Sequence, residues 1–346
     1  GRNVDERRDK IVGQADNMIL GQVLLLAVGD HHAKLLAEDV SKLDERSLTN
    51  LRFHHPQLLN RELCSDHAIV YHKPQVAEAA ATLRKCGVVV LEPSALGELP
   101  ALIEATNASI QSAFNTARWP ERSRPNSMRN GREAIIPSRG SMMDEIFRTM
   151  LTSPFGGLLH AYFGADANLQ SCLFWAGPPG SSAQDLHTDG EFGGGDILVF
   201  WTIDDLGDAP ACQNGEFAAI PGCFNHVSDS IGSPPWCEQV EDVPVDEVPF
   251  DKFKMHRFVQ SRRAGTVIFY NSQVLHAGCP NHSARSKLAI SLQIGPSSTL
   301  PQSDFVADAW AGNTWAISEM ERLNRMWVEA TKPTPPPAAT TGTSCK

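Results

Sequence analysis

The sequence predicts a mainly β protein with flanking helices, built on an antiparallel barrel or jelly roll. Six short segments are rich in β-branched or aromatic residues, and Gly, Pro, Asn or Asp bounds each of them, as is typical of strands. No helical segment of roughly 10 to 15 residues separates them, which argues against a parallel α/β sheet. The six segments are Leu169–Trp175, Asp196–Ile203, Gly215–Ile220, Gly265–Tyr270, Val274–Gly278 and Lys287–Ile294.

Length and charge limit the class of protein. The 346 residues suffice for a large core, and a formal net charge of −10 argues against a general binder of phosphate backbones, which concentrates Lys and Arg on one surface. The longest apolar run, Met18–Gly29, is too short to cross a bilayer. We therefore expect a small-molecule partner, no nucleic acid and no membrane span.

The 8 cysteines are scattered along the chain, without a C-x-x-C pair or the short framework of a disulfide-stapled domain. This pattern favours mostly reduced thiols in an intracellular, cytoplasmic protein. Because the chain begins with Gly rather than Met, a leader that has been removed is also compatible with the sequence.

The flanking segments are expected to be helical. Residues 1–70 are charged and Leu-rich with helical spacing, which predicts an N-terminal helical extension able to mediate self-association. The main domain is expected over 71–331. It opens with an Ala-rich helix at Val76–Lys85, which Gly87 ends, followed by a strand at Val88–Leu91.

The segment 117–140 is rich in Pro, Gly and Arg and predicts a long loop. Two interpretations remain open. In one, the loop is a lid whose Arg124 and Arg129 meet an anionic substrate. In the other, which is the commoner case, its arginines pair with acids on the surface.

Three further segments complete the expected organisation. An acidic, Pro-rich insert at 228–254 is expected to wrap the barrel or overhang its mouth. Helices are expected at 305–331, where large apolar residues recur at helical spacing. The low-complexity stretch 332–346 predicts a disordered tail.

The chemistry is expected at His187 and Asp189, which are one residue apart and point to the same side of an extended strand. This pair alone is a weak signal, since a single His can be a core residue and a single Asp a turn cap. A second candidate, His276, stands near the end of another predicted strand. Two imidazoles and one carboxylate are the donors that hold one face of Fe(II) in non-haem oxygenases.

With these motifs the chain resembles the phytanoyl-CoA dioxygenase family of Fe(II)- and 2-oxoglutarate-dependent oxygenases, from about Val76 to Gly295. The resemblance implies a double-stranded β-helix of the jelly-roll or cupin type over about 168–295, with Fe(II), 2-oxoglutarate and O2 as cofactor and co-substrates. The matching motifs, in order, are Arg84–Val90, Pro178–Gly180, His187–Gly190, Trp201-Thr202, Asn214-Gly215, Pro221-Gly222, Gly265–Phe269 and His276–Asn281.

By the same resemblance His187, Asp189 and His276 match the metal ligands, and Trp201 matches an aromatic residue that lines the 2-oxoglutarate pocket. The family's arginine for the far carboxylate of 2-oxoglutarate is replaced by Lys287. Arg285, two residues earlier, would share its face of a strand.

Either cation can neutralise a carboxylate, but only Arg offers a bidentate fork. Lys287 is preferred because it keeps the family register. Gly177 stands where the family often has a Lys before Pro-Pro-Gly.

The expected function is hydroxylation of a C–H bond in a small organic substrate, with release of succinate and CO2. Anionic and CoA-linked compounds are the candidate substrates. The carboxylate of Asp189 favours oxygen insertion, because related halogenases carry a small residue there. A same-fold oxygenase that catalyses desaturation, epoxidation or ring rearrangement is the alternative, and a non-catalytic jelly-roll binding protein is the second.

Overall fold

The chain divides into two compact units, Gly1–Leu63 and Cys64–Lys346. The computed structural model describes residues 64–96, 129–135, 150–151, 153–164, 167–189, 195–207, 210–224, 237, 239–250, 256–260, 263–296 and 325, all in the second unit. Several expected features lie wholly or mostly outside the described residues: the N-terminal extension before residue 64, most of the arginine-rich segment 117–140, part of the insert 228–254, nearly all of 305–331, where helices are expected, and the expected tail 332–346.

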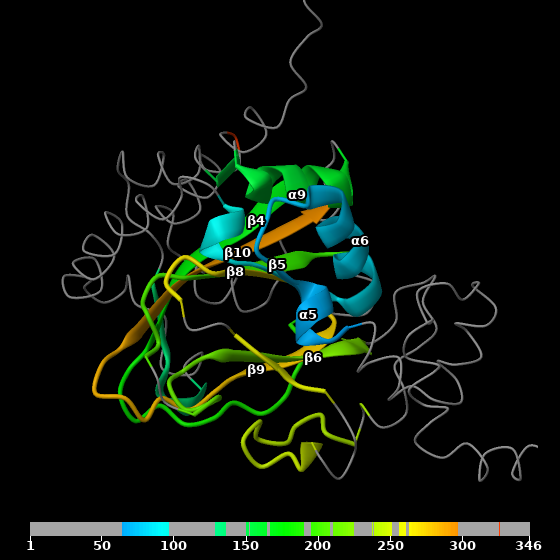
Figure 1. The fold of residues 1–346 in the computed structure, drawn as a ribbon. Coiled ribbons are helices and arrows are strands. Elements are labelled where there is room, and N and C mark those ends of the chain that lie inside the picture. Colours follow the sequence, from blue (N-terminus) through cyan, green and yellow to red (C-terminus); the bar gives the residue numbers. More distant parts are fainter. Residues whose placement is uncertain are drawn as a thin grey trace, which may run out of the picture. The chain divides into compact units, whose positions relative to one another are not determined.

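Two β-sheets form the frame of the described part (Figure 1). The larger has seven strands in the order β1 (Val70–Tyr71), β2 (Val88–Leu91), β8 (Val267–Asn271), β5 (Ile197–Thr202), β10 (Lys287–Pro296), β4 (Ala167–Gly177) and β3 (Glu133–Ile135). The smaller has three, in the order β7 (Phe258–Val259), β6 (Phe217–Phe224) and β9 (Val274–Gly278). Only β1 and β2 pair in parallel; the other pairs are antiparallel.

The strand order is that of a double-stranded β-helix. Along the chain from β4 to β10 the strands move between the sheets, giving β8-β5-β10-β4 in the larger one and β7-β6-β9 in the smaller one. The segment around His187 adds to the free side of β9, through the bridge from His187 to His276. The predicted fold class is therefore confirmed, and the extended segment that carries the first two site residues lies beside β9, which carries the third.

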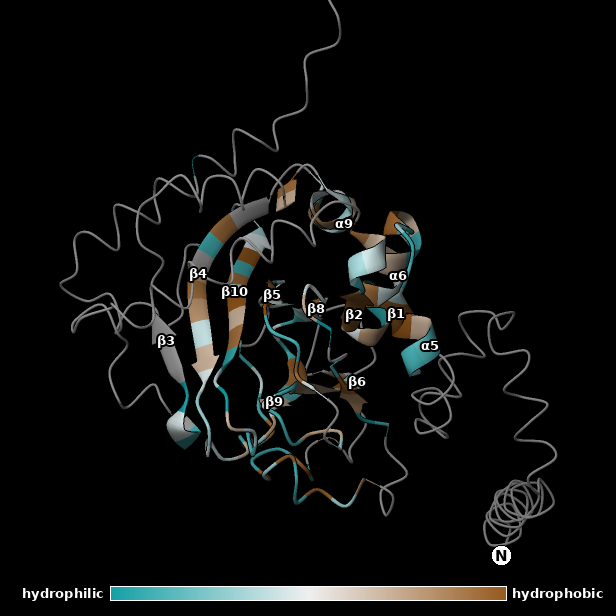
Figure 2. Ribbon diagram, turned by 60° about the vertical axis from the view of Figure 1, so that its left-hand side comes forward, coloured by the Kyte–Doolittle hydropathy of each residue, from teal (hydrophilic) through white to brown (hydrophobic). Residues whose placement is uncertain are grey.

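Alternation along β10 separates the protein core from the interior of the barrel. Leu288, Ile290, Leu292 and Ile294 belong to a hydrophobic core behind the larger sheet, whereas the intervening residues face the smaller sheet. Helices α6 (Val76–Cys86) and α9 (Pro154–Phe163) cover that core (Figure 2).

The Ala-rich helix predicted at Val76–Lys85 is present as α6, and Gly87 ends it with a left-handed φ of 71°. The other helices within the described residues are short: α5 (Asp66–Ile69), η2 (Pro93–Ala95) and η4 (Arg129–Gly131). In the part of the chain that the structure describes, none of the helices has the length and apolarity of a bilayer crossing.

The expectation of mostly reduced thiols is wrong for the described cysteines. Disulfides join Cys64 to Cys86, Cys212 to Cys279 and Cys223 to Cys237, while Cys172 is buried without taking part in one. The spacing of the cysteines along the sequence did not indicate these disulfides, because the fold brings the paired cysteines together across as many as 67 residues. Since disulfides persist in oxidising environments, the thiol-based reason for expecting a cytoplasmic protein no longer holds.

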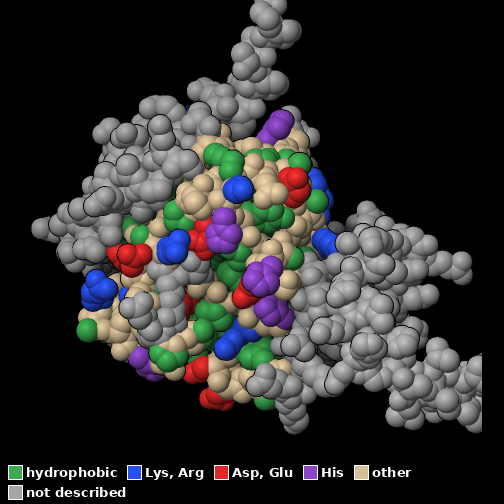
Figure 3. Space-filling model, viewed as in Figure 1, with side chains coloured by type: hydrophobic (Ala, Val, Ile, Leu, Met, Phe, Trp, Pro, Cys, Tyr) green, Lys and Arg blue, Asp and Glu red, His purple; other side chains and the backbone are tan. Residues whose placement is uncertain are grey.

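Charges of both signs are interspersed on the face drawn in Figure 3. Among the described side chains on that face, Lys and Arg do not form the continuous stripe with which proteins bind a phosphate backbone.

Candidate metal centre and its cavity

His187 lies directly opposite His276 of β9, to which it is joined by an isolated β-bridge. Their backbones exchange two hydrogen bonds: the His187 N–H donates to the His276 carbonyl at 3.0 Å, and the His276 N–H donates back at 2.9 Å. The ring centroids are 4.5 Å apart. One donor atom from each ring and one carboxylate oxygen of Asp189 all lie within 4.8 Å of one another. The structure thus brings together the three residues that the sequence predicts as metal ligands.

Each imidazole presents its Nε2 atom to this cluster. The Nδ1 of His187 lies 2.7 Å from the Asp185 carbonyl, and the Nδ1 of His276 lies 2.9 Å from the Val274 carbonyl. In the neutral ring, Nδ1 therefore carries the proton and donates it to the backbone, which leaves the Nε2 lone pair for a metal. Both rings are held in the tautomer that metal binding requires.

Asp189 contacts both rings. Its Oδ2 is 3.0 Å from His276 Nε2, and its Oδ1 is 3.6 Å from His187 Nε2. Tyr270 donates a hydrogen bond to Oδ2 at 3.1 Å. The two histidines and Tyr270 thus hold the Asp189 carboxylate at the wall of the barrel interior.

The pKa values of this group follow from those contacts. Enclosure disfavours the charge of Asp189, but the positive charges of His276 and His187, together with hydrogen bonds from His276 and Tyr270, hold its pKa well below the usual range. Burial opposes protonation of His276, yet the Asp189 carboxylate raises its pKa above the ordinary value. A divalent cation held by the three residues would take over this neutralisation of the Asp189 carboxylate.

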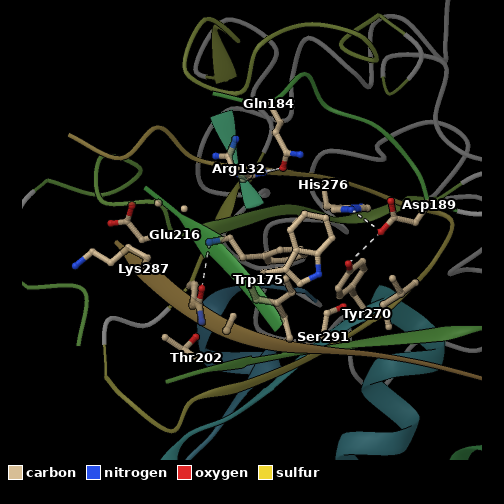
Figure 4. Close-up of a pocket in the computed structure, with 18 of the residues that line it drawn as sticks. Arg132, Trp175, Gln184, Asp189, Thr202, Glu216, Tyr270, His276, Lys287 and Ser291 are labelled. Carbon is tan, nitrogen blue, oxygen red and sulfur yellow. Dashed lines mark hydrogen bonds and ion pairs between the residues drawn. The ribbon is translucent and has the colours of Figure 1, made fainter. Parts of the chain in front are cut away.

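A cavity of about 570 Å³ adjoins the three residues between the two sheets (Figure 4). Apolar and aromatic side chains of the larger sheet form one wall: Leu173, Trp175, Leu198 and Phe200. The volume lies within the range of about 300–1,000 Å³ that holds small organic ligands. The candidate metal centre is therefore open to a chamber large enough for a small molecule.

Lys287 and Arg285 are separated by the structure. Lys287 is the first residue of β10, is buried and lines the cavity, with its Nζ 3.4 Å from the Asp205 carbonyl. Burial and, after it, the charge of Arg285 lower the pKa of Lys287, although nearby acids act in the opposite direction. Arg285 precedes the strand and is exposed, outside the cavity lining.

The placement expected for Trp201 is wrong. Its side chain is buried in the hydrophobic core behind the larger sheet, whereas its neighbours Phe200 and Thr202 line the cavity. Successive residues of a strand face opposite sides, so a difference of one residue moves a side chain from the pocket to the core. Trp175 of β4 and Phe200 of β5 provide the aromatic wall instead.

The arginine-rich loop contributes Arg132. Arg124 lies outside the described residues, and Arg129 begins η4 without its side chain being described. Arg132 is buried and lines the cavity, where its Nη1 donates to the Ser182 carbonyl at 2.9 Å and its Nη2 to the Cys279 carbonyl at 2.6 Å. Burial lowers its pKa to about 10, so it remains a cation at neutral pH.

Sequence reasoning also missed three polar residues that line the cavity: Thr202, Gln260 and Tyr270. Thr202 Oγ1 and Gln260 Nε2 are buried and have no hydrogen-bond partner within the part of the chain that the structure describes. The Oε1 of Gln260 accepts from the Phe217 N–H at 3.1 Å, which fixes the orientation of its amide. Tyr270 alone carried a signal, since it shares a strand face with residues of the barrel interior.

The fold and the site define a double-stranded β-helix protein with a cluster of two histidines and one carboxylate that could hold a metal ion, the donor set of non-haem Fe(II) oxygenases. No family model matches the chain, and no curated protein sequence matches it.

Among solved structures, the chain is similar to the α-ketoglutarate-dependent epimerase SnoN of nogalamycin biosynthesis, with 15% identity, coverage of 68% of this chain and 90% of SnoN, and a TM-score of 0.48. It is also similar to AviO1 from Streptomyces viridochromogenes, with 14% identity, coverage of 67% and 99%, and a TM-score of 0.48.

A third structure is EctD from S. alaskensis with 2-oxoglutarate and 5-hydroxyectoine, with 14% identity, coverage of 65% and 77%, and a TM-score of 0.47. The fold class rests on the strand topology, and the proposed chemistry rests on the site residues. The similarities to these three structures are too low in identity and TM-score to carry either conclusion.

Proposed function

We propose that this protein is a non-haem Fe(II)- and 2-oxoglutarate-dependent dioxygenase of the phytanoyl-CoA dioxygenase type, which hydroxylates a C–H bond of a small organic substrate. The observation that carries the proposal is the convergence of two Nε2 atoms and one carboxylate within 4.8 Å at the wall of a cavity of about 570 Å³. Three protein ligands on one side of a metal leave positions open on the other, as catalytic rather than structural sites require.

His187, Asp189 and His276 would hold the iron. Their fit to a divalent cation rests on two features: both rings present Nε2 because Nδ1 is bound to the backbone, and the carboxylate is ionised beside them. When bound, Fe(II) with 2-oxoglutarate and O2 supplies the oxidising power that removes hydrogen from an unactivated C–H bond and yields succinate and CO2. The chain's part is to fix the ligands, orient the two organic molecules and limit access of water.

We infer that the far carboxylate of 2-oxoglutarate is bound by Lys287 together with Thr202 and Gln260. All three are buried cavity residues, and the Thr202 hydroxyl and the Gln260 amide lack partners among the described residues, so an incoming carboxylate would satisfy donors that are otherwise costly to bury. Figure 4 shows Lys287 beside Glu216 at the end of the cavity away from Asp189. Two neutral donors beside one lysine supply hydrogen bonds that the family's arginine fork would otherwise provide.

Arg132 is the second cation of the cavity. Among the described residues no carboxylate pairs with it; its hydrogen bonds go to two backbone carbonyls, which leave part of its five-donor fork available. We assign it to the anionic end groups of the molecules that enter, the co-substrate first. Anionic ligands are thus still proposed, but the arginine proposed to bind them is Arg132 at the cavity wall instead of Arg124 and Arg129.

The substrate is proposed to be a small organic compound that packs against the apolar wall of Leu173, Trp175, Leu198 and Phe200. Anionic and CoA-linked compounds stay candidates, and neither nucleic acid nor membrane is needed for the site to work. The metal-bound protein is thereby expected to accept ligands with an apolar body and a polar end.

The test is substrate-stimulated turnover of 2-oxoglutarate by protein loaded anaerobically with Fe(II), read as O2 uptake and succinate release over a panel of small acids and their CoA thioesters. Asp189→Ala should abolish both signals, because it removes the only carboxylate of the triad. Asp185→Ala is the matched control, since Asp185 also lines the cavity but is no ligand. Undiminished turnover in Asp189→Ala would refute the assignment.

Product mass then separates the alternatives. In a substrate without a C=C bond, a gain of one oxygen atom identifies hydroxylation; where a C=C bond is present, the same gain also fits epoxidation, and NMR of the product distinguishes the two. A loss of two hydrogens identifies desaturation or ring closure. Saturable binding of panel compounds with no O2 uptake in any reaction would point to the non-catalytic binding protein.

A further inference from the structure

Tyr270 stands between the larger sheet and the candidate metal centre. It belongs to β8, is 3% exposed, lines the cavity and donates its hydroxyl to Asp189 Oδ2 at 3.1 Å (Figure 4). The family resemblance assigns this position no role, and the hydroxyl joins β8 to the candidate ligand on the segment that pairs with β9 through His187.

The ring of Tyr270 is held from two sides. Its centroid lies 4.6 Å from that of His276 and 4.7 Å from that of Phe217, and the Phe217 ring itself stacks on His276 at 5.4 Å. A side chain enclosed in this way keeps one rotamer, so its hydroxyl is fixed relative to the metal ligands. The hydrogen bond therefore acts on one chosen carboxylate oxygen rather than on either.

That choice matters for the number of coordination positions. A carboxylate can bind a metal through one oxygen or through both. In an octahedral site, two imidazoles and one oxygen leave three positions, which suffice for a chelating 2-oxo acid and O2. If both carboxylate oxygens bound, one of those positions would be lost.

We propose that Tyr270 is a positioning residue that ties Oδ2 and so keeps Asp189 a one-oxygen ligand. The inference rests on the proposed metal site and adds a determinant of its open positions. Tyr270 does not need to touch the metal or the substrate for this role; it acts through Asp189.

Co(II) is the probe, because its visible absorption reports coordination number without turnover. Tyr270→Phe removes only the hydroxyl and keeps the ring contacts with Phe217 and His276, so the fold is expected to persist, which the Tm checks. The matched control is Tyr71→Phe, which removes a hydroxyl bonded to Thr82 Oγ1 at 2.8 Å on β1, outside the cavity lining.

We expect the Tyr270→Phe protein to bind Co(II) with an altered visible spectrum, and the Co(II)-loaded variant to bind 2-oxoglutarate about 10- to 100-fold more weakly, as is typical when the partner of a metal ligand is lost. Tyr71→Phe should match the parent protein in both measurements. An unchanged spectrum and unchanged 2-oxoglutarate affinity in Tyr270→Phe would overturn this inference alone. Failure of the parent protein to bind Co(II) would overturn the proposed metal site, and this inference with it.

Discussion

The guanidinium of Arg132 lies where a side chain at Gly278 would stand. A Cβ at Gly278 would lie 2.8 Å from both Nε and Nη2 of Arg132, and 2.7 Å from Gln184 Oε1. Gly278 follows His276 by two residues on β9 and so shares its inward face. The absence of a side chain here lets a buried cation rest against the strand that carries a metal ligand.

Gly278→Ala should therefore displace Arg132 from the cavity wall, because the flexible guanidinium yields more easily than the backbone. We expect the Kd for 2-oxoglutarate, measured calorimetrically on Co(II)-loaded protein without O2, to rise about tenfold, which corresponds to the loss of one charge-assisted contact of about 1.4 kcal/mol. Co(II) affinity should change little. An equal loss of both affinities would mean that the substitution disturbs the ligands themselves.

The lowered pKa of Lys287 predicts an alkaline limit to co-substrate binding. A lysine is charged below its pKa and neutral above it, so the KM for 2-oxoglutarate should rise with pH through a pKa that lies below the ordinary lysine value. Lys287→Arg should remove this limit, since the guanidinium stays protonated. Arg285→Gln should keep the limit and move it to higher pH, because the charge of Arg285 lowers the pKa of Lys287. KM measured from neutral to alkaline pH in the parent protein and both variants is the test, and loss of the alkaline limit in Arg285→Gln would assign co-substrate binding to Arg285 instead.

The disulfide between Cys212 and Cys279 should contribute more to stability than the one between Cys223 and Cys237. The sequence separations are 67 and 14 residues, for which the chain-entropy model gives about 4 and about 3 kcal/mol of unfolding free energy. Paired Ser variants compared by denaturant unfolding under oxidising conditions provide the measurement.

Loss of the longer link should also weaken 2-oxoglutarate binding, because the Cys279 carbonyl accepts from Arg132. Free thiols at all four positions in the oxidised protein, detected by alkylation and mass spectrometry, would contradict the disulfide assignment.

Substitution by Ala should mainly lower stability at Trp201 and mainly lower ligand affinity at Trp175. Trp201→Ala is expected to lower the free energy of unfolding by about 3–5 kcal/mol, because Trp201 is 1% exposed in the core behind the larger sheet. Trp175→Ala should cost less stability and reduce ligand affinity instead, since Trp175 lines the cavity. Thermal unfolding and ligand titration on the two variants test the corrected assignment; a large affinity loss with little destabilisation in Trp201→Ala would restore the sequence-based expectation.

The sequence by itself determined the strand-rich core, the helix that ends at Gly87 and the three candidate metal ligands. These features are local or rest on simple periodicity: a left-handed glycine ends a helix, and residues two apart on a strand share a face. That is why His187 and Asp189 could be paired before the fold was known, and why the family motifs placed His276 with them.

Only the tertiary structure decided which side chains enter the cavity. Lys287 and Arg285 have the same parity, so alternation could not separate them; β10 begins at Lys287 and leaves Arg285 outside. Which side of the sheet the Trp201 side chain faces depends on the register of β5, and pairing with β8 and β10 sets that register. Tyr270, Arg132 and the cysteine partners meet their neighbours across sheets or loops distant in sequence, and contacts of that kind are set by folding rather than by spacing.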